Sequence, residues 1–189
     1  ENIELLCYNH YFLTVGDIKQ HEVWKKFFEG NEDKFNVYIH PKFKLNGLPY
    51  QSDGLFEKAN GLINRGANYE ISIGNFIQEW LDNNDYVAVK TSGSTGLPKN
   101  LELSKKKMIN SAKATGTFFK LPENTTALLC LPSNYIAGKM MLVRAMILGW
   151  NLYIVAPEKN AISHYDTEYD FVAMVPYQVH YSLKYLNKI

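Results

Sequence analysis

Nine consecutive residues near the middle of the chain combine the side chains and the backbone freedom needed to hold a polyphosphate. They include four hydroxyls, two glycines and one cation: Thr91, Ser92, Gly93, Ser94, Thr95, Gly96 and Lys99. Glycines let backbone N–H groups approach an anion closely, hydroxyls can donate to several phosphate oxygens, and lysine supplies a positive charge. The pattern predicts a phosphate-binding loop, and a flexible surface turn is the alternative interpretation.

This loop differs from two common motifs that also contain glycine and serine. A Walker A loop has four residues between its glycines and a lysine directly after the second glycine. Here two residues separate Gly93 from Gly96, and Pro98 precedes Lys99. The Gly-x-Ser-x-Gly order of a hydrolase nucleophile elbow is absent too.

Two strands and two helices are expected to position the loop. Residues 86–89 are short and rich in β-formers, and residues 101–103 alternate, so they predict an incoming and a return strand. Apolar residues recur at helical spacing over 73–81, before the first strand. Ser104 is a suitable N-cap for a helix that runs to about Phe119, after the second strand.

The remaining pattern predicts an α/β fold with a mostly parallel sheet flanked by helices. Further helices are expected at 52–64, 137–148 and 176–186, and further strands at 126–131, 152–155 and 171–175. Gly149 is expected to cap the second of these helices, and Pro176 to begin the third. Strands joined through single helices favour parallel pairing.

The first forty residues form a pattern of their own. Strand character over 3–15, an amphipathic helix over 17–28 and a strand over 36–39 predict a βαβ-like segment. The sequence therefore divides into residues 1–41 and a second part, residues 42–189.

Composition excludes several classes of protein. Of 189 residues, 46% are hydrophobic, and the net charge is +1, so neither overall disorder nor a nucleic-acid-binding surface is expected. Cys7 and Cys130 lack CxxC spacing, which fits a reducing compartment, and the five histidines lack metal-ligand spacing. No apolar run reaches about 18 residues and no signal peptide is visible, so the protein is expected to be cytoplasmic, without a membrane partner.

The segment 91–99 resembles the phosphate-loop signature of the adenylate-forming enzymes, which include acyl-CoA synthetases, aryl-CoA ligases, peptide-synthetase adenylation domains and luciferase. The resemblance implies a partial AMP-binding domain over residues 42–189. It implies that a carboxylic acid and ATP give an acyl-adenylate and pyrophosphate, and that CoA then forms a thioester. ATP, Mg²⁺ and CoA are the implied cofactors, and Thr91 and Lys99 are the implied catalytic residues.

A second motif is similar to one in o-succinylbenzoate–CoA ligases of menaquinone biosynthesis, which commonly reads Leu-Pro-x-x-His-x-x-Gly with a later arginine. Leu131, Pro132, Gly138 and Arg144 match it, and Tyr135 stands where many relatives have histidine. The resemblance implies that Tyr135 and Gly138 border the acyl pocket. It implies that Arg144 meets the second carboxylate of the substrate, and a surface arginine is the alternative.

The resemblance covers about residues 42–189 and reaches none of the family's later motifs. Those motifs bind adenine and ribose, hold Mg²⁺ through a glutamate and supply a catalytic lysine, so the chain alone is expected to be inactive. A non-catalytic truncated fragment is one alternative. A glycosyltransferase-like sugar-nucleotide binder is another, because residues 8–42 faintly resemble branching N-acetylglucosaminyltransferases.

Three further patterns have structural interpretations. The run Lys105-Lys106-Lys107 predicts a solvated helix face. Tyr177, Tyr181 and Tyr185 repeat every four residues, which favours a packed helix side over a stacking platform. Residues 175–178 resemble a strand-to-helix step near the family's substrate pocket, although a proline at the first position of a helix explains them equally well.

Overall fold

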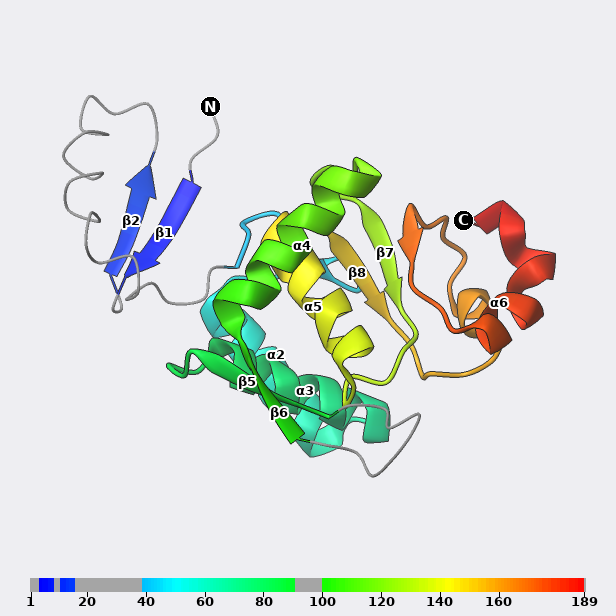
Figure 1. Cartoon of the computed structure of the whole chain (residues 1–189), viewed down its shortest axis with the longest axis horizontal. Coiled ribbons are helices and arrows are strands. Elements are labelled where there is room, and N and C mark those ends of the chain that lie inside the picture. Colours follow the sequence, from blue (N-terminus) through cyan, green and yellow to red (C-terminus); the bar gives the residue numbers. More distant parts are fainter. Residues whose placement is uncertain (1–3, 9–10, 16–38, 91–99, 189) are drawn as a thin grey trace.

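The computed structural model describes residues 4–8, 11–15, 39–90 and 100–188, which form an α/β fold around a five-stranded sheet (Figure 1). The strands lie in the order β4-β3-β8-β7-β9. Their bounds are β3 Lys44–Leu45, β4 Leu48–Pro49, β7 Thr126–Leu129, β8 Asn151–Ile154 and β9 Phe171–Val172. The pairs β3–β8, β7–β8 and β7–β9 are parallel and only the edge strand β4 is antiparallel, which confirms the predicted fold class.

Helices fill the connections, largely where the apolar spacing predicts them. Their bounds are α2 Ser52–Arg65, α3 Asn68–Leu81, α4 Lys105–Phe119, α5 Ile136–Leu148 and α6 Pro176–Ser182. Helices α2 and α3 pack against each other, as do α4 and α5. Gly149 ends α5 with a φ of 71°, a left-handed conformation that glycine adopts without strain.

Two C-terminal elements are shorter than predicted. Strand β9 has two residues instead of the five expected over 171–175. Helix α6 ends at Ser182, and a 3₁₀ helix over Leu183–Lys188 follows it, with a non-helical backbone at Tyr185. Helical spacing alone does not distinguish one continuous helix from a kinked pair. The helix that was predicted to end at 186 was therefore too long.

The loop-flanking strands form a separate two-stranded antiparallel sheet rather than part of the main one. These are β5, Tyr86–Lys90, and β6, Asn100–Ser104, and the register pairs Lys90 with Asn100. Both strands were predicted within one or two residues. The pairing of Lys90 with Asn100 places the two residues that flank segment 91–99 in sequence opposite each other.

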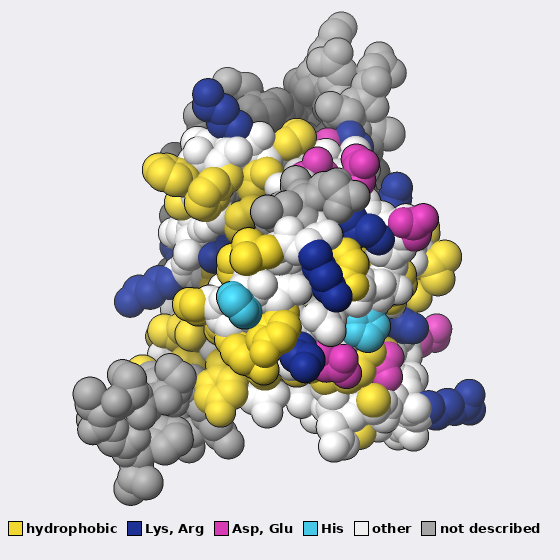
Figure 2. Space-filling model, turned by 90° about the vertical axis from the view of Figure 1, so that its right-hand side faces the viewer, with side chains coloured by type: hydrophobic (Ala, Val, Ile, Leu, Met, Phe, Trp, Pro, Cys, Tyr) yellow, Lys and Arg dark blue, Asp and Glu magenta, His cyan; other side chains and the backbone are white. Residues whose placement is uncertain are grey.

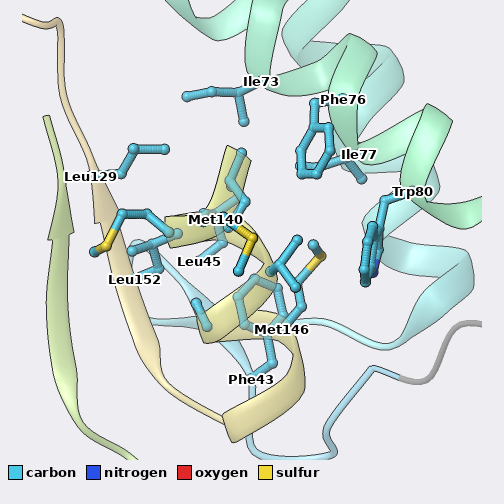
Figure 3. Close-up of a cluster of buried hydrophobic side chains, with 14 of the residues drawn as sticks. Phe43, Leu45, Ile73, Phe76, Ile77, Trp80, Leu129, Met140, Met146 and Leu152 are labelled. Atoms are coloured by element: carbon cyan, nitrogen blue, oxygen red, sulfur yellow. The ribbon is translucent and has the colours of Figure 1, made fainter. Parts of the chain in front are cut away.

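The interior strand β7, between β8 and β9, separates two hydrophobic clusters because successive side chains point to opposite faces. Ala127 and Leu129 belong to the larger cluster, which includes residues of α3 and α5, and Figure 3 shows the side chains of these elements meeting there. Leu128 and Cys130 belong to the smaller cluster on the other face. Both faces of the strand are thus buried, as its continuous apolar run indicates.

The buried thiol of Cys130 is expected to resist modification. It donates a 3.4 Å hydrogen bond to the carbonyl of Ala173, and burial raises its pKa to about 11. The reactive thiolate is therefore scarce near neutral pH. In a Cys7→Ser chain at pH 8, we expect a thiol reagent to label Cys130 quickly in urea and not in the folded protein. Rapid labelling of the folded chain would contradict the burial.

Two strands lie in the N-terminal range that is predicted to have strand character, 3–15. They are β1, Glu4–Tyr8, and β2, Tyr11–Val15, and they pair in antiparallel fashion. The expected helix over 17–28 and nearly all of the expected strand over 36–39 lie outside the described residues. The division between residues 1–41 and 42–189 stays a prediction.

Candidate functional site

The predicted phosphate loop lies between the two strands of the β5–β6 hairpin. Its residues Thr91, Ser92, Gly93, Ser94, Thr95, Gly96 and Lys99 lie outside the described part of the chain, so their predicted roles stay predictions. The described elements that border the candidate site are the hairpin, α3 and the beginning of α5.

A buried lysine joins the end of the hairpin to α3. Lys105 Nζ donates to the main-chain oxygen and to the carboxylate of Asp82, at 2.9 and 2.8 Å. The pKa of Asp82 is lowered: partial burial acts against this, but hydrogen bonds from Lys105 and Asn84 outweigh it. Since Lys105 is only 4% exposed, the prediction that residues 105–107 form a solvated face was wrong for this residue.

A second buried lysine joins the middle of β5 to both α3 and α5. Lys139 Nζ lies 2.9 Å from Glu79 Oε2 and donates to the carbonyl of Ala88 at 2.7 Å. Glu79 Oε1 accepts the N–H of Ala88 at 2.6 Å. The ammonium group also lies 4.8 Å from the centre of the Phe76 ring, within the range of a cation–π contact.

Sequence reasoning missed Glu79 and Lys139. One signal was present, because Lys139 is a charged residue directly before the apolar run Met140 to Val143. A charged residue on a helix that is apolar all round needs a buried partner. The identity of that partner depends on how α3 and α5 pack, which local spacing does not give.

A cavity of about 800 Å³ opens next to these side chains. The described residues that line it are Ser72, Asn75, Phe76, Glu79, Ala88, Val89, Leu101, Glu102, Ser133, Asn134 and Lys139. They come from α3, the hairpin, the turn before α5 and α5 itself. Ser133 Oγ is buried and has no hydrogen-bond partner within the described structure, so it can donate to or accept from a group in the cavity.

The second motif spans the turn before α5 and the first turns of that helix. Tyr135 is the N-cap of α5 and its side chain is 41% exposed. Gly138 is buried against the turn, where a Cβ atom would lie 2.3 Å from the carbonyl oxygen of Pro132. Both residues therefore lie at the end of α5 that borders the cavity.

Arg144 lies further along α5 and turns toward α4. Its Nε donates to Thr115 Oγ1 at 3.2 Å, and its Nη1 lies 3.7 Å from the sulfur of Met141. Burial lowers the pKa of the guanidinium group. Arg144 is half-buried and does not line the cavity, so the described structure does not bring it together with Tyr135 and Gly138.

Residues 175–178 begin α6, with Pro176 in its first turn. The side chain of Gln178 is buried, accepts the N–H of Val175 and donates to the carbonyl oxygens of Cys130 and Glu158. These contacts fit the structural interpretation of the segment. Figure 2 views the molecule from the side of α6 and shows hydrophobic side chains on this face.

The prediction of a packed tyrosine side was wrong for two of the three tyrosines. Tyr177 and Tyr181 are 59% and 37% exposed and form an edge-to-face pair, with ring centres 4.9 Å apart. Only Tyr185 packs against the smaller hydrophobic cluster. The kink after α6 explains the difference, because it breaks the helical alignment of the three rings.

Comparisons with known proteins connect the fold to one class of enzyme. No protein-family model and no curated protein matches the chain. Among solved structures, the chain is similar to an acyl-CoA synthetase (AMP-forming)/AMP-acid ligase II-like protein from Dyadobacter fermentans DSM 18053, with 36% identity and a TM-score of 0.60. That match covers 69% of this chain and 37% of the other, so this chain spans well under half the length of that protein.

Two structures of o-succinylbenzoate CoA synthetase from Bacillus subtilis also match, each at 18% identity. The complex with the acyl-adenylate OSB-AMP has a TM-score of 0.36, and the match covers 55% of this chain and 34% of the Bacillus chain. The complex with ATP and magnesium has a TM-score of 0.34 and matches 58% and 28%. The Dyadobacter match, in contrast, is close enough to show that the chain is related to adenylate-forming acyl-CoA ligases.

Proposed function

We propose that the chain is the N-terminal part of an ATP-dependent acid–CoA ligase. Such an enzyme converts a carboxylic acid and ATP into an acyl-adenylate and pyrophosphate, and then transfers the acyl group to CoA. The observation that carries the proposal is the 36% identity with the Dyadobacter acyl-CoA synthetase-like protein over 69% of this chain. The signature at 91–99, placed between paired strands, supports it.

In this proposal the loop residues act by electrostatic stabilisation. Backbone amides, hydroxyls and Lys99 bind the β- and γ-phosphates and stabilise the negative charge that pyrophosphate carries as it leaves. Thr91 and Lys99 are the proposed catalytic residues of this group. A carboxylate oxygen forms the new bond to the α-phosphorus while the bond to pyrophosphate breaks, so no covalent enzyme intermediate is needed, and the enzyme also holds the two reactants in line.

The proposed enzyme also uses Mg²⁺ and CoA. Among residues 4–8, 11–15, 39–90 and 100–188, no group of three or more His, Cys, Asp or Glu side chains could hold a metal ion. We therefore assign none of these described residues to Mg²⁺. No helix in these described ranges is long and apolar enough to cross a membrane, and we propose a cytoplasmic enzyme.

We propose o-succinylbenzoate as the acid, on the strength of the motif from Leu131 to Arg144. Tyr135 and Gly138 would border the acyl group at the start of α5. Arg144 would meet the second carboxylate through the N–H groups that do not contact Thr115 or Met141. A buried carboxylate needs such a cation or well-placed donors, because burial without a partner costs several kcal/mol.

A Lys99→Met substitution is expected to weaken ATP binding by about 1.5–3 kcal/mol, the range for one hydrogen bond to a charged group. Calorimetric titration of the purified chain with ATP measures the change. Lys107→Met is the control, because Lys107 is exposed on α4 and its loss should leave the affinity unchanged. Equal affinity of the Lys99 variant and the unsubstituted chain, or no ATP binding by either, would refute the proposed loop.

A further inference from the structure

We propose that Glu79 and Lys139 are positioning residues that hold strand β5, the described element directly before the proposed phosphate loop in sequence, in the orientation that nucleotide binding needs. The proposal rests on the proposed function, because it assigns a consequence for ATP to two residues outside the loop. Neither Glu79 nor Lys139 is assigned a contact with the nucleotide.

The two side chains form a clamp on one residue of β5, Ala88. Glu79 Oε1 accepts the N–H of Ala88 at 2.6 Å, and Lys139 Nζ donates to the carbonyl of Ala88 at 2.7 Å. The two side chains bind each other at 2.9 Å. Both main-chain groups of Ala88 are thus bound to side chains of α3 and α5.

The hairpin contains only two strands, and an isolated two-stranded hairpin is at best marginally stable in water. Val87 and Val89 of β5 pack into the main core, to which α3 and α5 contribute the fully buried Trp80, Met141 and Leu142. The clamp adds main-chain hydrogen bonds at Ala88, between these two valines. The clamp therefore transfers the rigidity of the core to β5, close to the loop.

The clamp lies close to the proposed phosphate loop in the sequence. Ala88 precedes Thr91 by only three residues, and β5 remains paired with β6 as far as Lys90 and Asn100. A displacement of β5 would therefore also displace Lys90, the last described residue before segment 91–99. Errors of about 1 Å in the placement of binding groups can cost on the order of a hundredfold in catalysis.

Lys139 is better suited to this role than to contact with an anion. Its side chain is 9% exposed, and Glu79 neutralises its charge. Two of its three N–H donors are directed at Glu79 and Ala88. The cavity beside it also contains Glu102, so the lining does not favour a phosphate at this position.

A double variant, Glu79→Met with Lys139→Met, separates positioning from simple stability. It removes both charges at similar volume, and replacing a buried ion pair in this way is often neutral for stability. It still leaves the N–H and the carbonyl of Ala88 without the clamp. We expect amide exchange at Ala88 to accelerate, and the Kd for ATP to rise, by about tenfold or more each, which corresponds to ~1.4 kcal/mol.

Lys105→Met is the matched control. Lys105 is equally buried and also binds a carboxylate and a main-chain oxygen, but it does so at the far end of the hairpin. We expect its loss to change the ATP Kd by less than about threefold. If the double variant does not fold, Lys139→Met alone is compared with Lys105→Met, and it should show the larger rise in Kd.

The two measurements distinguish the possible failures. Unchanged exchange at Ala88 in the double variant would overturn the clamp itself. Faster exchange with an unchanged Kd for ATP would overturn the positioning role. If the unsubstituted chain does not bind ATP, the proposed function fails and the positioning role fails with it, while the exchange data still decide whether the clamp exists.

Discussion

Replacing Gly138 with alanine is expected to destabilise the folded chain by about 3 kcal/mol, the upper end of the range for overpacking a buried site. A Cβ atom at this position would lie 2.3 Å from the carbonyl oxygen of Pro132 and 2.9 Å from the Cα of Ser133. Both neighbours are backbone atoms, so neither can turn away as a side chain could. The turn before α5 would have to move, and with it the motif from Leu131 to Arg144.

Urea unfolding of Gly138→Ala, followed by circular dichroism, measures this loss. Gly61→Ala is the matched control, because Gly61 also lies inside a helix but a Cβ there would have no neighbour within 4 Å. Alanine at position 61 is expected to stabilise the chain by about 0.5–1 kcal/mol through its higher helix propensity. A Gly138→Ala chain as stable as the parent would show that the turn adapts, and that Gly138 is not required by packing.

The elements around the candidate site could be predicted because they depend on local pattern. Strands β5 and β6 follow from alternation and were found within one or two residues, whereas α3 follows from apolar spacing and begins at Asn68, before the predicted start at 73. In the same way, Gly149 marked the C-terminal end of α5 and Pro176 marked the start of α6. These signals act over a few residues, so the sequence displays them directly.

The partners of charged side chains could not be predicted, because they depend on how distant elements pack. Lys105 and Lys139 are both buried, yet one lies in a run of lysines and the other beside apolar residues. Each of them binds a carboxylate that is distant in sequence: Lys105 binds Asp82, at the end of α3, and Lys139 binds Glu79, within α3. Arg144 shows the same limit, because its helix was predicted but its orientation toward Thr115 of α4 was not.

Trp80→Ala is expected to have the largest effect on stability, about 3–5 kcal/mol, because it removes a large side chain from a site that cannot collapse fully. Trp80 is fully buried on α3, its ring centre lies 6.0 Å from that of Phe76, and Figure 3 shows it among the core side chains between α3 and α5. Since small domains are stable by only about 5–15 kcal/mol, a substantial unfolded fraction is expected at moderate temperature. Thermal and urea unfolding measure the loss.

Two further variants show whether that loss comes from packing. The indole N–H of Trp80 is buried without a hydrogen-bond partner within the described structure. Trp80→Phe therefore loses volume but no hydrogen bond. Its loss of unfolding free energy should be less than half of the loss caused by Trp80→Ala. Tyr86→Ala removes an aromatic ring that is 55% exposed, and it should cost less than about 0.5 kcal/mol. If Trp80→Phe were as damaging as Trp80→Ala, the stabilisation would come from an interaction of the N–H group, and the packing explanation would be wrong.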